Sequence, residues 1–210
     1  MDPQRDDSEH DAAHGGSRPP GHDAAHWDER YRATDRLWSR EPNATVVDVL
    51  APLTPGRALD LGAGEGRHAV WLAHSGWAVT AVDFSVAGID RGRDAVSASS
   101  LEVDWRVADV RWWLPETAYD LVLVAYLHLV EDVLARAASW LALGGRLVVV
   151  GHALRNLTDG VGGPSDPRLL HTEDQLRAAA ADLTIERLGE VERTTPAGVA
   201  IDICLVARKA

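Results

Sequence analysis

A glycine-rich turn is the part of the sequence whose residue types and spacing most clearly suit chemistry. The turn follows a short apolar run and contains Gly62, Gly64 and Gly66. Glycine lets the backbone turn tightly and approach a ligand, and a helix that begins after the turn points its free amide groups at that ligand. The pattern therefore predicts a small-molecule site where a strand passes into a helix.

Two carboxylates accompany this turn. Asp83 lies at the tip of the next apolar strand, where a carboxylate can accept hydrogen bonds from both hydroxyls of a ribose. Asp60 lies just before the glycines, where it would repel a pyrophosphate but would suit a cofactor with an ammonium and a sulfonium group. The GxGxG spacing also differs from the GxGxxG of dinucleotide-binding enzymes. A positively charged nucleoside cofactor is therefore favoured over NAD.

His128, in the string VAYLHLV, is the candidate for acid–base chemistry. Histidine is the one side chain in this string that titrates near neutral pH. We expect His128 to act as a general base or to orient an acceptor, and the alternative is that it packs at the start of the following helix. Tyr126 beside it would bound the site or contact the cofactor.

Three aromatic residues, Trp27, Tyr31 and Trp38, are spaced so that a helix running to Arg40 would carry them on one face. Such a helix is either a lid, whose aromatic faces attract a sulfonium and enclose an acceptor, or a core element that seals the sheet. A long loop over 154–170 is a further candidate to cover the acceptor, and His152 lies at its start.

These candidates need a sheet to position them. Continuous apolar strands are expected over 57–61, 78–82, 103–107, 120–125 and 146–150, with helical segments between them, including one at about 130–143. This alternation implies a parallel sheet covered on both faces. Two more strands, at about 183–192 and 199–207, predict an antiparallel hairpin at the sheet edge. The predicted fold class is α/β, a Rossmann-like, doubly wound, mostly parallel seven-stranded sheet with a C-terminal antiparallel hairpin.

Composition narrows the function classes. The chain has 210 residues and a formal charge of −11, which disfavours nucleic acid as a partner, and no apolar run approaches a membrane span of about 20 residues. A single cysteine, Cys204, excludes an internal disulfide, and no metal site is expected. We expect a cytoplasmic protein, a monomer or homodimer, whose partner is a small-molecule acceptor.

The domain organisation predicted from composition has two parts. Residues 1–26 are acidic, contain four histidines and few large apolar side chains, and are expected to form a disordered tail; a metal-binding tail is the alternative. Residues 27–210 are expected to form one domain, with 27–52 as an N-terminal helical lid.

The string ALDLGAGEGRHAVWLAHSGWAVTAVDFS, residues 58–85, resembles the first two motifs of the class I S-adenosylmethionine-dependent methyltransferases. Its second part is similar to the small bacterial enzymes related to the tellurite-resistance methyltransferase. The resemblance extends from about Trp27 to the C-terminus. It implies S-adenosyl-L-methionine as cofactor and S-adenosyl-L-homocysteine as product. Ala63 stands where the family commonly has cysteine or another small residue.

The resemblance also implies roles for single positions. Asp60 would orient the methionine part of the cofactor, Asp83 would bind the ribose, and Asp109 would accept the adenine amino group. Phe84 would pack against the adenine and Val110 would offer it an amide. The full set of implied cofactor residues is Asp60, Gly62, Ala63, Gly64, Arg67, Asp83, Phe84, Ser85, Asp109, Val110, Ala125 and Tyr126.

The expected function is methyl transfer to a small-molecule nucleophile, an oxygen, sulfur or nitrogen atom or a chalcogen oxyanion, by in-line displacement. DNA amino-methylating members carry an Asp/Asn-Pro-Pro-aromatic string after the fourth strand, and this chain has AlaTyrLeuHis there. Two alternatives stay open: a non-catalytic sensor that binds S-adenosylmethionine, and an NAD-dependent oxidoreductase, which Asp60 and the glycine spacing disfavour.

Overall fold

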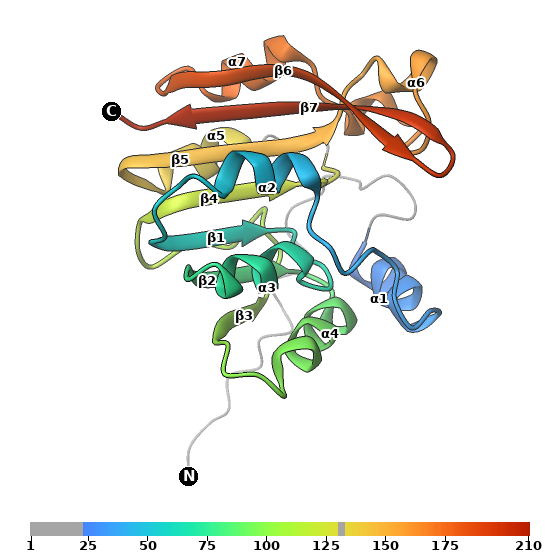
Figure 1. Cartoon of the computed structure of the whole chain (residues 1–210), viewed down its shortest axis with the longest axis vertical. Coiled ribbons are helices and arrows are strands. Elements are labelled where there is room, and N and C mark those ends of the chain that lie inside the picture. The colour runs from blue at the N-terminus through green and yellow to red at the C-terminus, as the bar shows by residue number, and fades with distance from the viewer. Residues whose placement is uncertain (1–22, 130–132) are drawn as a thin grey trace.

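A seven-stranded sheet organises the computed structural model, which describes residues 23–129 and 133–210 (Figure 1). The strand order is β3-β2-β1-β4-β5-β7-β6. The first five strands in this order are parallel, and β7 runs antiparallel between β5 and β6. The strands are β1 Arg57–Leu61, β2 Ala78–Asp83, β3 Val103–Val107, β4 Tyr119–Ala125, β5 Leu141–His152, β6 Thr184–Thr195 and β7 Gly198–Arg208. The predicted fold class and the C-terminal hairpin are confirmed.

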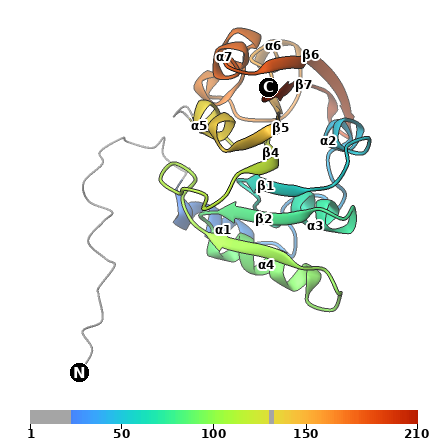
Figure 2. The same ribbon diagram turned by 90° about the vertical axis from the view of Figure 1, so that its left-hand side faces the viewer.

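Helices cover both faces of this sheet, as Figure 2 shows for α2 and α3 on one side and α5 and α7 on the other. Alternate strand residues feed two separate cores: Leu59 and Leu61 pack toward α5 and α7, and Ala58 packs toward α2 and α3. Residues of a strand alternate between faces, so Asp60 points to the same side as Ala58. The helices are α1 Ala24–Arg32, α2 Ala44–Leu50, α3 Arg67–His74, α4 Val86–Val96, α5 Leu134–Ser139, α6 Asn156–Asp159 and α7 Glu173–Ala179.

The N-terminal helix is shorter and begins earlier than the sequence predicts. Asp23 caps α1 by accepting a hydrogen bond from the backbone amide of His26 at 2.8 Å. The helix ends at Arg32, so Trp38 lies in the irregular segment that follows it. Residues 23–26, expected to belong to the tail, are therefore folded, and the rest of that predicted tail lies outside the described residues.

Two other boundaries also differ from expectation. The helix predicted over about 130–143 is observed only as α5, because Leu141 already begins β5. The loop predicted over 154–170 contains α6 and a short 3-10 helix, Pro167–Leu169. Among the described residues, no helix has the length and apolar character to cross a membrane.

The hairpin matters for the site because of its direction. In the antiparallel pair of β5 and β7, His152 lies opposite Asp202. The first half of β7 is thus placed beside the carboxyl ends of the parallel strands, where ligands bind in sheets of this kind. Figure 1 shows α1 beyond the same ends of β1 and β2.

Candidate active site

The glycine turn after β1 forms a cradle that other side chains closely approach. Gly62 and Gly64 have φ angles of 72° and 55°, in the left-handed region that favours glycine. A Cβ atom on Gly62 would lie 2.7 Å from Cδ1 of Leu127, and one on Gly64 would lie 2.5 Å from Oη of Tyr31. Only a bare backbone fits between these two side chains.

Asp83 is held rigidly at the end of β2. Its Oδ2 atom accepts a hydrogen bond from the amide of Gly64 at 2.9 Å, and its Oδ1 accepts one from the amide of Ser85 at 2.8 Å. Burial raises its pKa above the ordinary carboxyl value, although these two hydrogen bonds act in the opposite direction. Each oxygen has a further lone pair, so this carboxylate can still accept hydrogen bonds from a ligand.

Asp60 is a buried carboxylate directly before the turn. Within the part of the chain that the structure describes, its Oδ2 atom has no hydrogen-bond partner, and only 1% of the residue is exposed. Burial raises the pKa of Asp60 to about 7, and the nearby Arg67 partly opposes this. An unsatisfied buried acceptor is costly. A cationic ligand or its bridging water would satisfy it, which fits S-adenosylmethionine.

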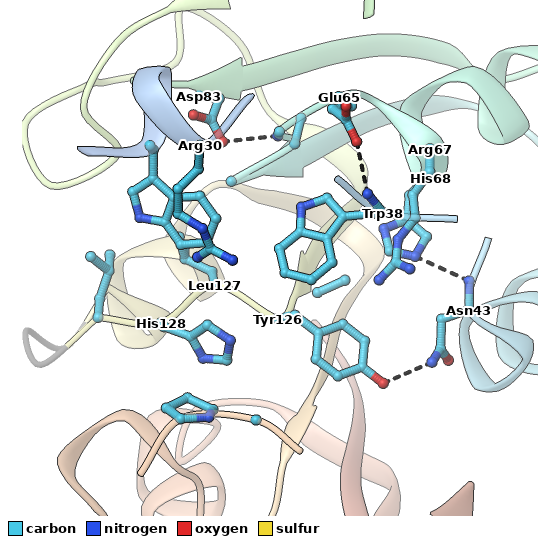
Figure 3. Close-up of a pocket in the computed structure, with 18 of the residues that line it drawn as sticks. Arg30, Trp38, Asn43, Glu65, Arg67, His68, Asp83, Tyr126, Leu127 and His128 are labelled. Atoms are coloured by element: carbon cyan, nitrogen blue, oxygen red, sulfur yellow. Dashed lines mark hydrogen bonds between the residues drawn. The ribbon is translucent and has the colours of Figure 1, made fainter. Parts of the chain in front are cut away.

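The glycine turn and Asp83 border a cavity of about 480 Å³ (Figure 3). It brings together residues that are far apart in the chain, and most of the predicted site residues line it: Trp27, Tyr31, Trp38, Gly62, Ala63, Gly64, Arg67, Asp83, Phe84, Ala125, Tyr126, His128 and His152. The fold therefore brings the glycine turn, the aromatic residues and both candidate histidines together around this cavity.

Four predicted residues do not line the cavity. Asp60 lies beneath the turn, and Ser85 is buried as the cap of α4, where its hydroxyl accepts a hydrogen bond from the amide of Gly88 at 3.0 Å. Val110 is packed in the core. Asp109 forms an ion pair of 2.7 Å with Arg111. The adenine contacts expected of Asp109 and Val110 remain proposals.

The three aromatic residues differ in burial. Tyr31 is 4% exposed and packs against the turn, whereas the centres of the Trp27 and Trp38 rings lie 6.2 Å apart along the cavity. The guanidinium of Arg30 lies 4.5 Å from the centre of the Trp27 ring. Tyr31 thus packs as a core residue of α1, and a lid role for Trp27 on α1 and Trp38 in the segment after it remains a proposal.

Glu65 fastens the segment after α1 to the glycine turn. Its carboxylate accepts hydrogen bonds from the amides of Leu37 and Trp38, the latter at 3.0 Å, as Figure 3 shows for Trp38. It also forms an ion pair of 2.6 Å with Arg91 of α4. The segment that contains Trp38 is thus held against the glycine turn by Glu65.

Tyr126 connects the strand end to the opposite wall. Its φ angle of 57° is unusual for a residue with a side chain and indicates a strained backbone of the kind found at functional sites. Its hydroxyl donates to Oδ2 of Asp202 at 2.5 Å and accepts from Nδ2 of Asn43 at 2.7 Å (Figure 3 shows the second contact). The guanidinium of Arg67 lies 5.5 Å from its ring centre.

Sequence reasoning missed several residues of this site. Asp202 and Arg193 come from the hairpin, and the only signal was one acidic residue within the apolar run AIDICLVA. His68 is buried and accepts a hydrogen bond from the amide of Asn43 at 3.3 Å. Burial and the neighbouring Arg67 lower the pKa of His68 to about 3, so it is neutral. It supports the start of α2 rather than transferring protons.

Comparison with known proteins was made for both sequence and fold. A family model described as a methyltransferase domain matches residues 58–145. The chain is 32% identical over 160 residues, 67% of its length, to a probable non-canonical nonribosomal peptide synthetase, CymA, from Salinispora arenicola. The chain spans 2%, 15% and 50% of the lengths of three curated relatives that it matches.

Two solved structures share the fold over 89% of this chain. TehB from Haemophilus influenzae superposes with a TM-score of 0.68 at 20% identity, over 67% of its own chain. A protein from a study of the conversion of a disulfide bond into a thioacetal group during echinomycin biosynthesis superposes with a TM-score of 0.69 at 25% identity, over 93% of its chain.

Proposed function

We propose that the chain is a class I S-adenosylmethionine-dependent methyltransferase that transfers a methyl group to a small-molecule nucleophile by in-line displacement, and the match of a methyltransferase-domain model to residues 58–145 supports this. The acceptor atom is oxygen, sulfur, nitrogen or a chalcogen oxyanion. The observation that carries this proposal is the single cavity in which the glycine turn and Asp83 face His128 and His152. The residues proposed to bind the cofactor and the candidate acid–base groups therefore line the same cavity.

The cofactor side is formed by the turn and by two strand ends. Asp83 would accept the ribose hydroxyls, the backbone of Gly62, Ala63 and Gly64 would lie beneath the methionine part, and Asp60 would satisfy its ammonium. Phe84 and the segment at Asp109 and Val110 would hold the adenine, with Arg67, Ala125 and Tyr126 along the methionine end. When bound, S-adenosylmethionine supplies an electrophilic methyl carbon on a sulfonium.

The acceptor side has to orient a nucleophile and exclude water. Trp27 and Trp38 would cover the cavity and exclude water. Holding the two reactants in line within such a site can lower the activation free energy by about 7–11 kcal/mol. A histidine of this cavity, either His128 as the sequence indicates or its neighbour His152, would deprotonate or orient the acceptor. The cavity of about 480 Å³ falls in the range of roughly 300–1,000 Å³ that is typical of small-ligand sites, which supports a small molecule rather than a nucleic acid.

Calorimetry with S-adenosylmethionine, S-adenosylhomocysteine and NAD tests the cofactor. We expect the first two to bind and NAD not to bind. Asp83→Asn should lose at least about tenfold in affinity, because a charged acceptor of two hydroxyl donors is removed. Asp90→Asn, an exposed carboxylate on α4, is the matched control and should bind normally. Preferential binding of NAD would contradict the assignment.

A screen for methyl transfer to phenols, thiols, amines and selenite tests the reaction. Transfer to any of these confirms an enzyme. Binding of S-adenosylhomocysteine with no transfer to any acceptor would instead favour the sensor alternative, which needs the same cofactor residues but no acceptor side.

A further inference from the structure

We propose that His152 is the general base of the reaction, that Asp202 positions it, and that the acceptor is consequently a protic group. This inference rests on the proposed methyl transfer and assigns one residue to the removal of a proton. His128, the candidate from sequence, lies beside His152, and their rings are stacked with centres 6.0 Å apart and planes 7° apart. The case for His152 rests on the carboxylate that lies beside it.

The sheet register places a carboxylate behind His152. His152 ends β5 and Asp202 lies directly opposite it on the antiparallel strand β7. Side chains of directly opposed residues point to the same face of a sheet and lie close together. Nδ1 of His152 is 3.1 Å from Oδ1 of Asp202. In this conformation Nδ1 makes no hydrogen bond with any described residue, so the proposal is that the dyad closes across this short gap.

Asp202 is kept ionised and fixed although it is fully buried. Nε of Arg193 on β6 lies 2.6 Å from its Oδ2, and the Tyr126 hydroxyl donates to the same oxygen at 2.5 Å. Burial alone would raise the pKa of Asp202, but the contacts with His152, Arg193 and Tyr126 together lower it. A buried carboxylate is costly unless it is paired in this way. Three strands and one strained turn thus converge to hold a negative charge at Nδ1 of His152.

His152 also reaches the cavity, which it lines together with Gly163. The two residues pack closely, because a Cβ atom on Gly163 would lie 2.7 Å from Cδ2 and 2.9 Å from Nε2 of His152, so only glycine fits beside the imidazole. A carboxylate that accepts from Nδ1–H fixes the tautomer in which Nε2 carries the lone pair. In the proposed reaction this lone pair would take the proton of an acceptor bound in the cavity.

The proton transfer balances without a further reactant. Nε2 of His152 takes the proton of an acceptor X–H as the lone pair of X forms the bond to the methyl carbon. The carbon–sulfur bond breaks with its electron pair remaining on sulfur, which becomes a neutral thioether. The imidazolium, stabilised by Asp202, then releases its proton to water. An acceptor that is already an oxyanion needs no such base, so the dyad indicates a phenol, alcohol, thiol or neutral amine.

NMR of the imidazole nitrogens tests the dyad without an acceptor. In the wild type saturated with S-adenosylhomocysteine, His152 should be protonated on Nδ1 and bare on Nε2 at neutral pH. Asp202→Ala should shift the neutral imidazole of His152 toward the tautomer protonated on Nε2, because the acceptor beside Nδ1 is lost. The charged and titratable groups around His152 are Tyr126, His128, His171, Arg193 and Asp202. Protonation on Nε2 in the wild type, or an unchanged tautomer in Asp202→Ala, would overturn the proposal.

Kinetics with acceptors of different acidity tests the base. The probes are phenol with 4-nitrophenol and 2-mercaptoethanol with thiophenol, at pH 8. His152→Gln should lower kcat by about 100-fold or more for the weaker acid of each pair, and by less than about threefold for the acid that is already ionised. The rising limb of the wild-type pH profile should vanish in His152→Gln, whereas His128→Gln, whatever its rate, should keep it.

Two results would overturn the assignment of His152. One is an equal loss for both members of an acceptor pair, which would indicate a merely structural role. The other is transfer to selenite alone with the same rate in wild type and His152→Gln. Failure of the wild type to bind S-adenosylhomocysteine would contradict the proposed function itself, so the two failures are distinguishable.

Discussion

Asp28 of α1 is bound to Ser85 at the start of α4. Its Oδ1 accepts a hydrogen bond from the Ser85 hydroxyl at 2.5 Å and another from the amide of Ala87 at 3.0 Å. Burial alone would raise the pKa of Asp28, but these contacts and Arg32 lower it below the ordinary value. The aromatic helix is therefore attached by a carboxylate to the loop that follows Asp83.

Removing this attachment should weaken cofactor binding. We expect Asp28→Ala to bind S-adenosylhomocysteine about tenfold more weakly, because hydrogen bonds to a charged group are worth about 1.5–3 kcal/mol and only part of this is coupled to the ligand. Calorimetry measures the change. Glu29→Ala, an exposed carboxylate on the same helix, should bind as the wild type does. Equal affinities for the two variants would show that α1 does not support the cofactor loop.

Asp60 should make the stability of the ligand-free protein depend on pH. Its pKa is about 7 in the folded protein against 3.8 as the ordinary value, so the folded state keeps a proton that the unfolded chain has released. The unfolded state binds fewer protons between these values, and stability therefore falls as pH rises from about 4 to about 7. Asp60→Asn cannot ionise and should be more stable than the wild type at pH 8 by about 1–4 kcal/mol.

Urea unfolding of the ligand-free protein at pH 5 and pH 8 measures this difference, which should be smaller at pH 5. Asp48→Asn, an exposed carboxylate on α2, should show no such trend. Asp60→Asn should also bind S-adenosylmethionine at least about tenfold more weakly, because the acceptor for the ammonium is neutralised. A stability gap that does not vary with pH would contradict the buried, protonated state of Asp60.

Gly66 combines a left-handed backbone with a crowded surrounding. Its φ angle is 77°, and a Cβ atom there would overlap the ring of Trp105, whereas Gly144 has a φ of 79° and open space around it. Both alanine variants should lose about 1 kcal/mol through the backbone. Gly66→Ala should lose about 1–3 kcal/mol more through overpacking. Denaturant unfolding of the pair separates the two effects, and equal losses would show that Trp105 moves aside freely.

Ligand binding should change the fluorescence of the cavity tryptophans. Trp38 is 42% exposed and lies near Trp27 along the cavity, so a bound ligand should alter its contact with water. Adding S-adenosylhomocysteine should shift the emission, and Trp38→Phe should remove at least about half of the shift while the ligand still binds. Trp140→Phe, at the opposite end of β5 from His152, is the control. An unaltered emission shift in Trp38→Phe would show that a tryptophan other than Trp38 responds to the ligand.

The parts of the fold that were predicted are those set by apolar continuity. The strand over 57–61 was predicted from its apolar run, and every residue after the first is indeed buried. The turn after it was predicted from its glycines, which adopt the positive φ angles that other residues avoid. The extent of α1 was not predictable in the same way. The spacing that includes Trp38 matches a helical period, yet this residue reaches the cavity through an irregular segment held by Glu65.

The acid behind His152 could not be found from the sequence. Asp202 stands in an apolar strand that pairs with β5 rather than with a neighbour in the chain, and only the register shows which residue lies opposite it. Asp109 illustrates the converse. The resemblance assigns it to the adenine, while the structure also engages it with Arg111 two positions further on.

The glycine turn follows the first strand, β1, and Asp202 lies on the last strand, β7, so the groups on the two sides of the cavity are synthesised in a fixed order. The glycine turn is translated early, and Asp202 follows only when the seventh strand has emerged. The nascent chain therefore contains the residues proposed to bind the nucleoside before Asp202, the residue proposed to position the general base, has been synthesised. Because domains fold during translation from the N-terminal side, the proposed dyad of His152 and Asp202 would form last.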